Sequence, residues 1–158
     1  MTQIASPLAT GQKAPEFETT IQDGSQRSSA DYAGKKFVVY FYPRDMTPGC
    51  TAQACNLTDN FDALQEAGIE ILGVSPDPAA KHMKFIAKYD IRFDLACDED
   101  KSMHNAFGVW GLKKFMGKEY EGTHRTTFLI NENGEIHDVI LKPKTKDHAR
   151  EILAGFGL

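Results

Sequence analysis

The stretch Lys36–Cys55, KFVVYFYPRDMTPGCTAQAC, decides how this chain folds. Its first part, Phe37–Tyr42, is an unbroken run of β-branched and aromatic residues. Such a run favours a strand that is buried on both faces of an α/β sheet. Pro43 cannot donate a hydrogen bond to a neighbouring strand, so the strand is expected to end there. The stretch therefore predicts a buried strand that leads into the segment containing Cys50.

Cys50 is predicted to lie in the first turn of a helix. Thr47 is a favourable N-cap residue and Pro48 fits the first helical position, which makes Cys50 the third helical residue. Backbone N–H groups in the first turn lack intrahelical acceptors, and the helix dipole favours negative charge there. Such surroundings lower the pKa of a cysteine thiol from about 8.5 towards neutral or below. Cys50 is therefore a candidate thiolate nucleophile.

Cys55 follows Cys50 by five residues. In an ideal helix two such Cα atoms lie roughly 8.6 Å apart, whereas a disulfide tolerates at most about 7 Å. The two cysteines can therefore bond only if the first turns of the helix unwind. The spacing leaves two interpretations of Cys55 open, a reaction partner of Cys50 and a small buried apolar side chain.

Length and composition limit the class of protein. The 158 residues predict one domain over positions 1–158 with a loose segment at 1–10, and 41% hydrophobic residues suffice for a sizeable core. A formal net charge of -4 gives no basic footprint for nucleic acid. No apolar run approaches the roughly 20 residues of a membrane span, and no secretory signal is recognisable. Three cysteines are too few for a disulfide framework, which favours a reducing cytoplasm.

The remaining elements are expected to alternate between strands and helices. Apolar residues at helical spacing after Cys50 predict a helix to Ala67, with Gly68 at its end. Val109–Gly122 contains three glycines and several lysines and is predicted to be a loop. Strands are expected at 18–21, 69–74, 93–96, 126–130 and 136–141, a short helix or turn at 28–32, and helices from 75 to about 89, at 98–107 and at 146–156.

This order of elements predicts an α/β protein with a thioredoxin-like fold. A βαβ unit followed by an antiparallel hairpin and a closing helix implies a mixed central sheet with helices on both faces. The helix that begins at Ser75 is expected to bury an apolar face made of Met83, Phe85, Ile86 and Tyr89.

The segment from Pro43 to Cys50, PRDMTPGC, resembles the active-site pattern of the peroxiredoxins: proline, three residues, threonine, two residues, cysteine. A second cysteine at position 55 is similar to the bacterioferritin comigratory protein, or peroxiredoxin Q, subfamily. The resemblance extends from about Gly11 to the C-terminal helix. Further matching segments are VSPD at 74–77, FGVWG at 107–111, KFMG at 114–117 and HRTTFLI at 124–130.

The resemblance implies a thiol-dependent peroxidase that reduces hydrogen peroxide and organic hydroperoxides in antioxidant defence and needs no cofactor. Cys50 would attack the peroxide and become a sulfenic acid. Cys55 would resolve it as an intramolecular disulfide after local unwinding of the helix. Thioredoxin or glutaredoxin would then reduce the disulfide. Members of the subfamily are commonly monomeric, so a monomer is expected.

The resemblance also assigns roles to four residues around Cys50. Arg125 would hold the thiolate and polarise the peroxide, although an arginine at a strand start is otherwise an ordinary surface cation. The Thr47 hydroxyl would contact peroxide and sulfur, an interpretation favoured over its use as a helix cap. Pro43 would shield the sulfur, and the backbone N–H groups of Gly49 and Cys50 would bind a peroxide oxygen.

Cys97 and the histidines carry weaker signals. Cys97 at a strand end favours a small buried side chain over a second resolving thiol. The five histidines are scattered, so no zinc site is expected.

Three other functions compete with the peroxidase. The first is a dithiol–disulfide oxidoreductase, which is disfavoured because thioredoxins use a CxxC motif. The second is a redox sensor or holdase. The third is an acyl-transfer hydrolase, which needs a histidine base near Cys50.

Overall fold

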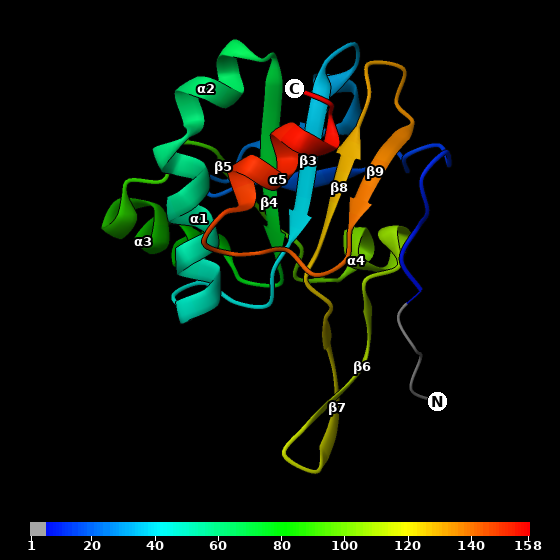
Figure 1. Cartoon of the computed structure of the whole chain (residues 1–158). Coiled ribbons are helices and arrows are strands. Elements are labelled where there is room, and N and C mark those ends of the chain that lie inside the picture. The colour runs from blue at the N-terminus through cyan, green and yellow to red at the C-terminus, as the bar shows by residue number, and fades with distance from the viewer. Residues whose placement is uncertain (1–5) are drawn as a thin grey trace.

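The computed structural model of the chain describes residues 6–158 and is built around a mixed five-stranded sheet (Figure 1). The strand order is β5-β4-β3-β8-β9, in which β3, β4 and β5 are parallel and β8 runs antiparallel to both β3 and β9. The predicted α/β class with a mixed, thioredoxin-like sheet is confirmed. The strands are β3 (Lys36–Phe41), β4 (Ile69–Ser75), β5 (Asp94–Cys97), β8 (Thr126–Ile130) and β9 (Ile136–Ile140).

Strand β3 lies at the centre of the sheet and is buried on both faces, as its sequence predicted. Successive side chains of a strand point to opposite faces, so alternate residues enter two separate hydrophobic clusters. Every residue from Phe37 to Tyr42 is at most 3% exposed. The first cluster takes Val38, Tyr40 and Tyr42, and the second takes Phe37, Val39 and Phe41.

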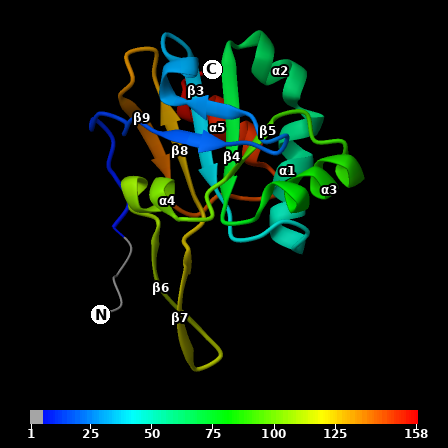
Figure 2. The ribbon, with the colours of Figure 1, turned by 180° about the vertical axis from the view of Figure 1, so that it is seen from behind.

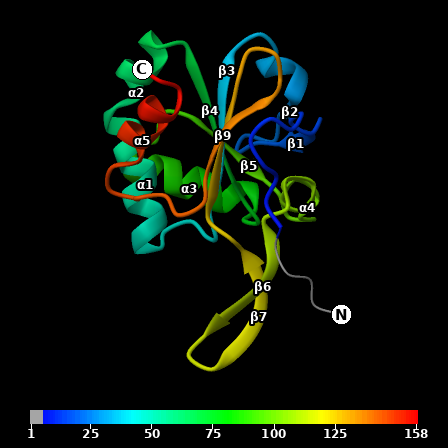
Figure 3. The ribbon, with the colours of Figure 1, turned by 45° about the vertical axis from the view of Figure 1, so that its right-hand side comes forward.

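Helices cover both faces of the sheet (Figures 2 and 3). The first cluster includes buried side chains from α1 (Pro48–Asp59), α2 (Phe61–Glu66), α3 (Ala79–Tyr89) and α5 (His148–Gly155). The second includes side chains of α4 (Ser102–Phe107) and of residues flanking a small hairpin, β1 (Glu18–Thr20) and β2 (Gln26–Ser28), which the 3-10 helix η1 (Ser29–Tyr32) follows.

The helix predicted from Cys50 to Ala67 is in fact two helices. It breaks at Asn60, whose side-chain amide donates to the Asn56 carbonyl at 2.8 Å. Such a local bond competes with the helical backbone pattern. Gly68 has φ +78° and ends the second helix, as expected.

Two other helices begin later than predicted. Helix α3 starts at Ala79 and not at Ser75. Helix α4 starts at Ser102 and not at Asp98, because the Asp98 carboxylate accepts the backbone N–H groups of the first turn of α4. The predicted apolar face of α3 is also partly wrong, since Met83 is 49% exposed and His82 is fully buried.

The loop predicted at Val109–Gly122 is also wrong. Strands β6 (Trp110–Phe115) and β7 (Lys118–Thr123) form an antiparallel hairpin that extends away from the body of the molecule (Figure 1). Its turn residues Met116 and Gly117 have φ +51° and +79°, the left-handed conformations that a tight hairpin turn requires. The glycines that suggested a loop include Gly111 and Gly122, which pair with each other across the hairpin.

The N-terminal segment packs against the second cluster. Residues 1–5 of the segment expected to be loose lie outside the described residues. Within residues 6–10, the Leu8 N–H donates to the Phe107 carbonyl at 3.2 Å, and the Leu8 side chain contacts the cluster. Over the described positions 6–158, no helix is long and apolar enough to cross a membrane.

Candidate active site

Cys50 lies at the carboxyl end of β3. The chain leaves the sheet at Tyr42, whose N–H donates to the Val74 carbonyl at 3.0 Å, and then makes a short loop before α1. Thr47 has the extended backbone of an N-cap residue and Pro48 begins α1, so Cys50 is the third helical residue, as predicted. Its side chain is 2% exposed. The sulfur is therefore nearly buried beside the unpaired N–H groups of a helix N-terminus.

Arg125 reaches the same place from the opposite direction. It directly precedes β8, whose first residue, Thr126, pairs with Phe41 at the end of β3. Its Nη2 donates to the Cys50 sulfur at 3.2 Å, and its Nη1 donates to Gln53 Oε1 at 2.6 Å. The structure thus places a fixed positive charge in direct contact with the candidate nucleophile.

Gly49 makes room for this contact. A Cβ atom at this position would lie 3.3 Å from Arg125 Nη2, closer than most carbon contacts in proteins. The resemblance to the peroxiredoxins assigned the backbone N–H of Gly49 to a peroxide oxygen. The structure shows that the space next to Gly49 is also used by the guanidinium group.

The Thr47 side chain does not cap α1. Its hydroxyl donates to the Arg44 carbonyl at 2.9 Å, and no side-chain cap bond is present, so the capping interpretation is wrong for the hydroxyl although the N-cap position is right. A hydroxyl that donates one bond keeps two lone pairs for accepting others. Pro43, which precedes this loop, is half-buried.

Cys55 lies further along α1 and is half-buried. Burial and the nearby negative charge of Asp59 raise the pKa of its thiol. Cys50, Cys55 and Cys97 are all unbridged, and α1 is intact between the first two. Cys97 ends β5 and pairs with Ser75 of β4, so it belongs to a strand two positions away from β3.

Gln53 is a site residue that sequence reasoning missed. It is fully buried, and its carbonyl oxygen accepts the bond from Arg125. Its Nε2 has no hydrogen-bond partner among the residues described. The available signal was its spacing, because residues three apart lie on the same face of a helix and Gln53 follows Cys50 by three.

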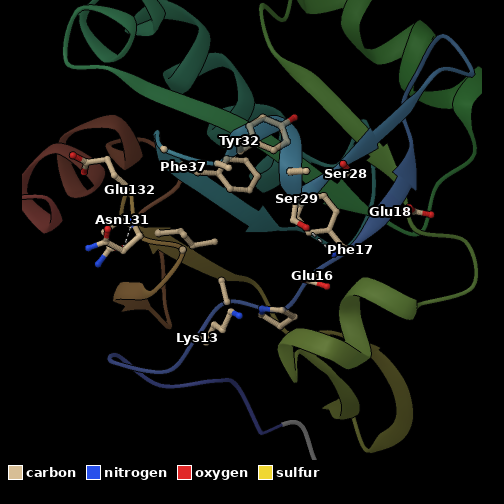
Figure 4. A pocket seen from close by; sticks show the side chains of 18 residues that line it. Lys13, Glu16, Phe17, Glu18, Ser28, Ser29, Tyr32, Phe37, Asn131 and Glu132 are labelled. Atoms are coloured by element: carbon tan, nitrogen blue, oxygen red, sulfur yellow. Dashed lines mark hydrogen bonds between the residues drawn. The ribbon is translucent and has the colours of Figure 1, made fainter.

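A cavity of about 760 Å³ lies elsewhere, at the opposite end of the sheet (Figure 4). Its walls include Phe37 near the start of β3 and Ile130 at the end of β8, together with the stacked ring of Tyr32. None of the predicted site residues lines it. The candidate active site is therefore separate from this cavity.

Comparison with known proteins places this site in a family. Residues 10–139 match the AhpC/TSA family. Peroxiredoxin Bcp of Escherichia coli is 47% identical over 148 residues, which cover 94% of this chain and 95% of the relative. Peroxiredoxin Bcp of Bacillus subtilis is 46% identical over 143 residues, covering 90% and 91% of the two chains. The structure of Xanthomonas campestris peroxiredoxin Q superposes with a TM-score of 0.84 at 35% identity, covering 89% of each chain.

The chain therefore belongs to the AhpC/TSA family and, within it, to the Bcp or peroxiredoxin Q group of peroxiredoxins. Peroxiredoxins are thiol peroxidases, and this protein is an enzyme of that class acting on hydroperoxides.

Proposed function

We propose that this enzyme reduces hydrogen peroxide and organic hydroperoxides by a two-cysteine mechanism within one chain. The observation that carries this proposal is the contact of 3.2 Å between Arg125 Nη2 and the Cys50 sulfur, at the N-terminus of α1. A buried thiol next to a guanidinium and unpaired backbone N–H groups has the surroundings of a reactive thiolate.

In the first step the Cys50 thiolate attacks one peroxide oxygen and the O–O bond breaks. The sulfur becomes a sulfenic acid, and the departing oxygen takes up a proton and leaves as water or an alcohol. Arg125 and the N–H groups of Gly49 and Cys50 stabilise the negative charge that develops on that oxygen. The Thr47 hydroxyl accepts the peroxide O–H, since its own proton is donated to Arg44. Pro43 limits the access of water.

In the second step the Cys55 thiolate attacks the sulfenic sulfur, and a disulfide and water form. Because α1 holds the two Cα atoms roughly 8.6 Å apart, the first turns of the helix unwind before this bond closes. A dithiol reductant of the thioredoxin or glutaredoxin class then attacks the disulfide and regenerates both thiols.

Organic hydroperoxides are included because of a solved relative. A structure of Xanthomonas campestris bacterioferritin comigratory protein, 34% identical and covering 89% of this chain, is described as bearing on alkyl peroxide reduction. We extend this substrate class to the present chain. We also propose that residues 1–158 act as a single domain in the cytoplasm. The protein would act as a monomer, because both cysteines of the cycle lie on one helix and no second chain is needed.

Gln53 positions Arg125 in this scheme. Its Oε1 accepts one guanidinium N–H at 2.6 Å, which directs the other towards the Cys50 sulfur. Because Gln53 lies on α1, this bond is lost when the helix unwinds.

Stopped-flow mixing of the reduced protein with one equivalent of hydrogen peroxide, followed by intact mass and peptide mapping, tests the mechanism. The wild type should react fast and become about 2 Da lighter through a Cys50–Cys55 bond. Cys50→Ser should lose the fast reaction. Cys55→Ser should keep it but accumulate sulfenic acid, and Cys97→Ser serves as the control that behaves like wild type. A wild-type reaction as slow as that of a free thiol would contradict the peroxidase mechanism, and a Cys50–Cys97 bond would remove Cys55 as the resolving residue.

A further inference from the structure

The loop that precedes α1, residues 43–47, contains a buried carboxylate that fixes it to the body of the molecule. Asp45 is 1% exposed, while its neighbours Arg44 and Met46 are exposed. A buried carboxylate is costly unless it is paired and hydrogen-bonded. The contacts of Asp45 therefore determine how this loop, here called the Cys50 loop, is held.

Asp45 is held by both its side chain and its backbone. The Tyr42 hydroxyl donates to Oδ1 at 2.6 Å, and His82 Nδ1 lies 2.6 Å from Oδ2. The Asp45 backbone N–H donates to Asp77 Oδ2 at 2.7 Å. Asp77 is in turn bound by Ser75 Oγ at 2.9 Å and by Lys81 Nζ at 3.2 Å.

His82 must be an imidazolium ion in this arrangement. Its Nε2 lies 2.9 Å from the Ala96 carbonyl and its Nδ1 faces the Asp45 carboxylate, and both of these partners can only accept. Burial lowers the pKa of His82, but the hydrogen bond and charge of Asp45, followed by hydrogen bonds with Cys97 and the Ala96 carbonyl, raise it to about 9. Ligand atoms of Asp45, Asp77 and His82 lie within 4.8 Å of one another, yet a doubly protonated ring has no lone pair for a metal ion.

The anchored residue adjoins the strained part of the loop. Met46 has φ +70°, a left-handed conformation that costs a non-glycine residue energy and persists only when its surroundings enforce it. Thr47 follows at the N-cap position, and the backbone N–H groups of Gly49 and Cys50 come directly after. The position of these peroxide-binding groups thus depends on where Asp45 is held.

We propose that His82 is a positioning residue for the peroxidase reaction: tied between the Asp45 carboxylate and the Ala96 carbonyl, it holds the Cys50 loop in the conformation that presents Thr47 and the first turn of α1 to a peroxide. This inference rests on the proposed function. His82 lies on α3 and acts through Asp45, so it does not touch the substrate.

Arg125 is supported independently of this network. It reaches the Cys50 sulfur from β8 and is oriented by Gln53. Loss of His82 should therefore displace the groups that bind peroxide but leave the guanidinium next to the sulfur. The expected signature is a selective loss of reaction with peroxide, because alkylation by iodoacetamide needs the thiolate but none of the peroxide contacts.

The experiment compares the second-order rate constants of Cys50 with hydrogen peroxide and with iodoacetamide at pH 7, each followed on the Cys50 peptide, in a Cys55→Ser background that retains Cys97 as a partner of His82. His82→Leu should lower the peroxide rate constant by about tenfold to a hundredfold, the range that small displacements of binding groups produce. The iodoacetamide rate constant should change by less than about twofold, within the effect of a peripheral change. Equal loss of both rates, or no loss of either, would overturn the proposal.

Further variants separate positioning from stability. Asp45→Asn preserves every bond, because its amide donates to a neutral His82 and its carbonyl accepts from Tyr42, so it should keep the peroxide rate. Asp45→Ala lies on a loop, leaves no large core cavity and should behave like His82→Leu, even if the latter folds poorly. The double variant that combines Asp45→Ala with His82→Leu should lose no more of the peroxide rate constant than either single variant.

Two controls complete the test. Ile136→Ala, in β9 and remote from the Cys50 loop, should lower stability and leave the ratio of the two rate constants unchanged. A wild-type protein that reacts with peroxide no faster than a free thiol would refute the proposed function, whereas a fast wild type with an unaffected His82→Leu variant would refute only the role of His82.

Discussion

The two segments on either side of Cys50 are held very differently. Before it, the Cys50 loop is anchored through the buried Asp45. Its carboxylate is bound by Tyr42, which directly follows β3, and by His82 of α3, and its backbone N–H donates to Asp77, which follows β4. After it, α1 has no side-chain N-cap, and three of its buried polar groups have no hydrogen-bond partner among the described residues. These groups are Thr51 Oγ1, Gln53 Nε2 and Thr58 Oγ1.

This difference matches what the two segments would do in the proposed mechanism. Each unpartnered buried polar group costs about 1–3 kcal/mol relative to its exposure to water. Unwinding α1 would let these groups bond to water, which offsets part of the lost packing. In the proposed mechanism the loop, by contrast, keeps its conformation because it presents the groups that bind peroxide. The segment before Cys50 would then stay fixed during the reaction, and the helix after it would unwind.

The largest effect should come from Arg125, which contacts the Cys50 sulfur and Gln53 on α1. Arg125→Ala removes the donor to the Cys50 sulfur and the partner of Gln53. We expect the rate constant with peroxide to fall about 10²- to 10³-fold, as when one donor to a developing negative charge is removed. Stopped-flow peroxide consumption measures this. Arg92→Ala, which removes an exposed arginine from Asp62, is the matched control and should react like wild type. A loss below tenfold would show that Arg125 is not central to the reaction.

The anchoring of the Cys50 loop should be detectable in the pH dependence of the free energy of unfolding. The folded pKa of His82 is raised to about 9 from an ordinary value of 6.5, so its contribution is complete below about pH 6.5 and is lost as the pH rises through 9. A shift of this size corresponds to about 3 kcal/mol. Urea unfolding of the reduced protein at pH 6 and pH 10 should show this loss in the wild type. Asp45→Asn, which leaves His82 neutral, should largely remove it, and parallel curves for the two proteins would contradict the ion pair.

The predictable parts of the molecule are those fixed by neighbouring residues. The run Phe37–Tyr42 could be recognised as a doubly buried strand, and Thr47 with Pro48 placed Cys50 at the third helical position, because each depends on a few adjacent side chains. Arg125 could be chosen only through the resemblance, since the contact joins residues 75 positions apart.

The parts that could not be predicted depend on tertiary partners. The β6–β7 hairpin looked like a loop because its glycines and lysines hide the strand pattern, and its register appears only when the two strands pair. His82 and Asp45 are 37 residues apart, and nothing local suggests that a histidine on α3 would be buried as the partner of a loop carboxylate. The anchoring of the Cys50 loop could therefore not be predicted from the sequence.

Helix α1 should unwind more readily when the hydrogen bonds that join it to the start of α5 are removed. Asn56 donates to the Lys146 carbonyl at 3.0 Å and accepts from the Ala149 N–H at 2.8 Å. Asn56→Ala should lower the free energy of unfolding by about 1–2 kcal/mol. Disulfide formation after a peroxide pulse should become up to about tenfold faster, since 1.4 kcal/mol is a factor of ten. Quenched-flow mass spectrometry measures this rate, and Asn105→Ala on α4 is the control. A slower disulfide step would show that unwinding does not limit it.

The smallest expected effect concerns the Cys55 thiol itself. Burial and the charge of Asp59, one helical turn further on, raise the pKa of this thiol, so its attacking thiolate becomes abundant only at higher pH. Asp59→Asn removes the repulsion and should speed disulfide formation at pH 7 by about 1.5- to 2-fold, the size of a like-charge pair at this helical spacing. The gain should vanish at high salt and at a pH where the thiol is already ionised. Asp62→Asn, an exposed acid on α2, is the matched control. An equal gain in disulfide rate in both variants would attribute the effect to net charge. No gain in either would mean that Cys55 has moved away from the charge of Asp59 before it attacks, as expected if the helix is fully unwound.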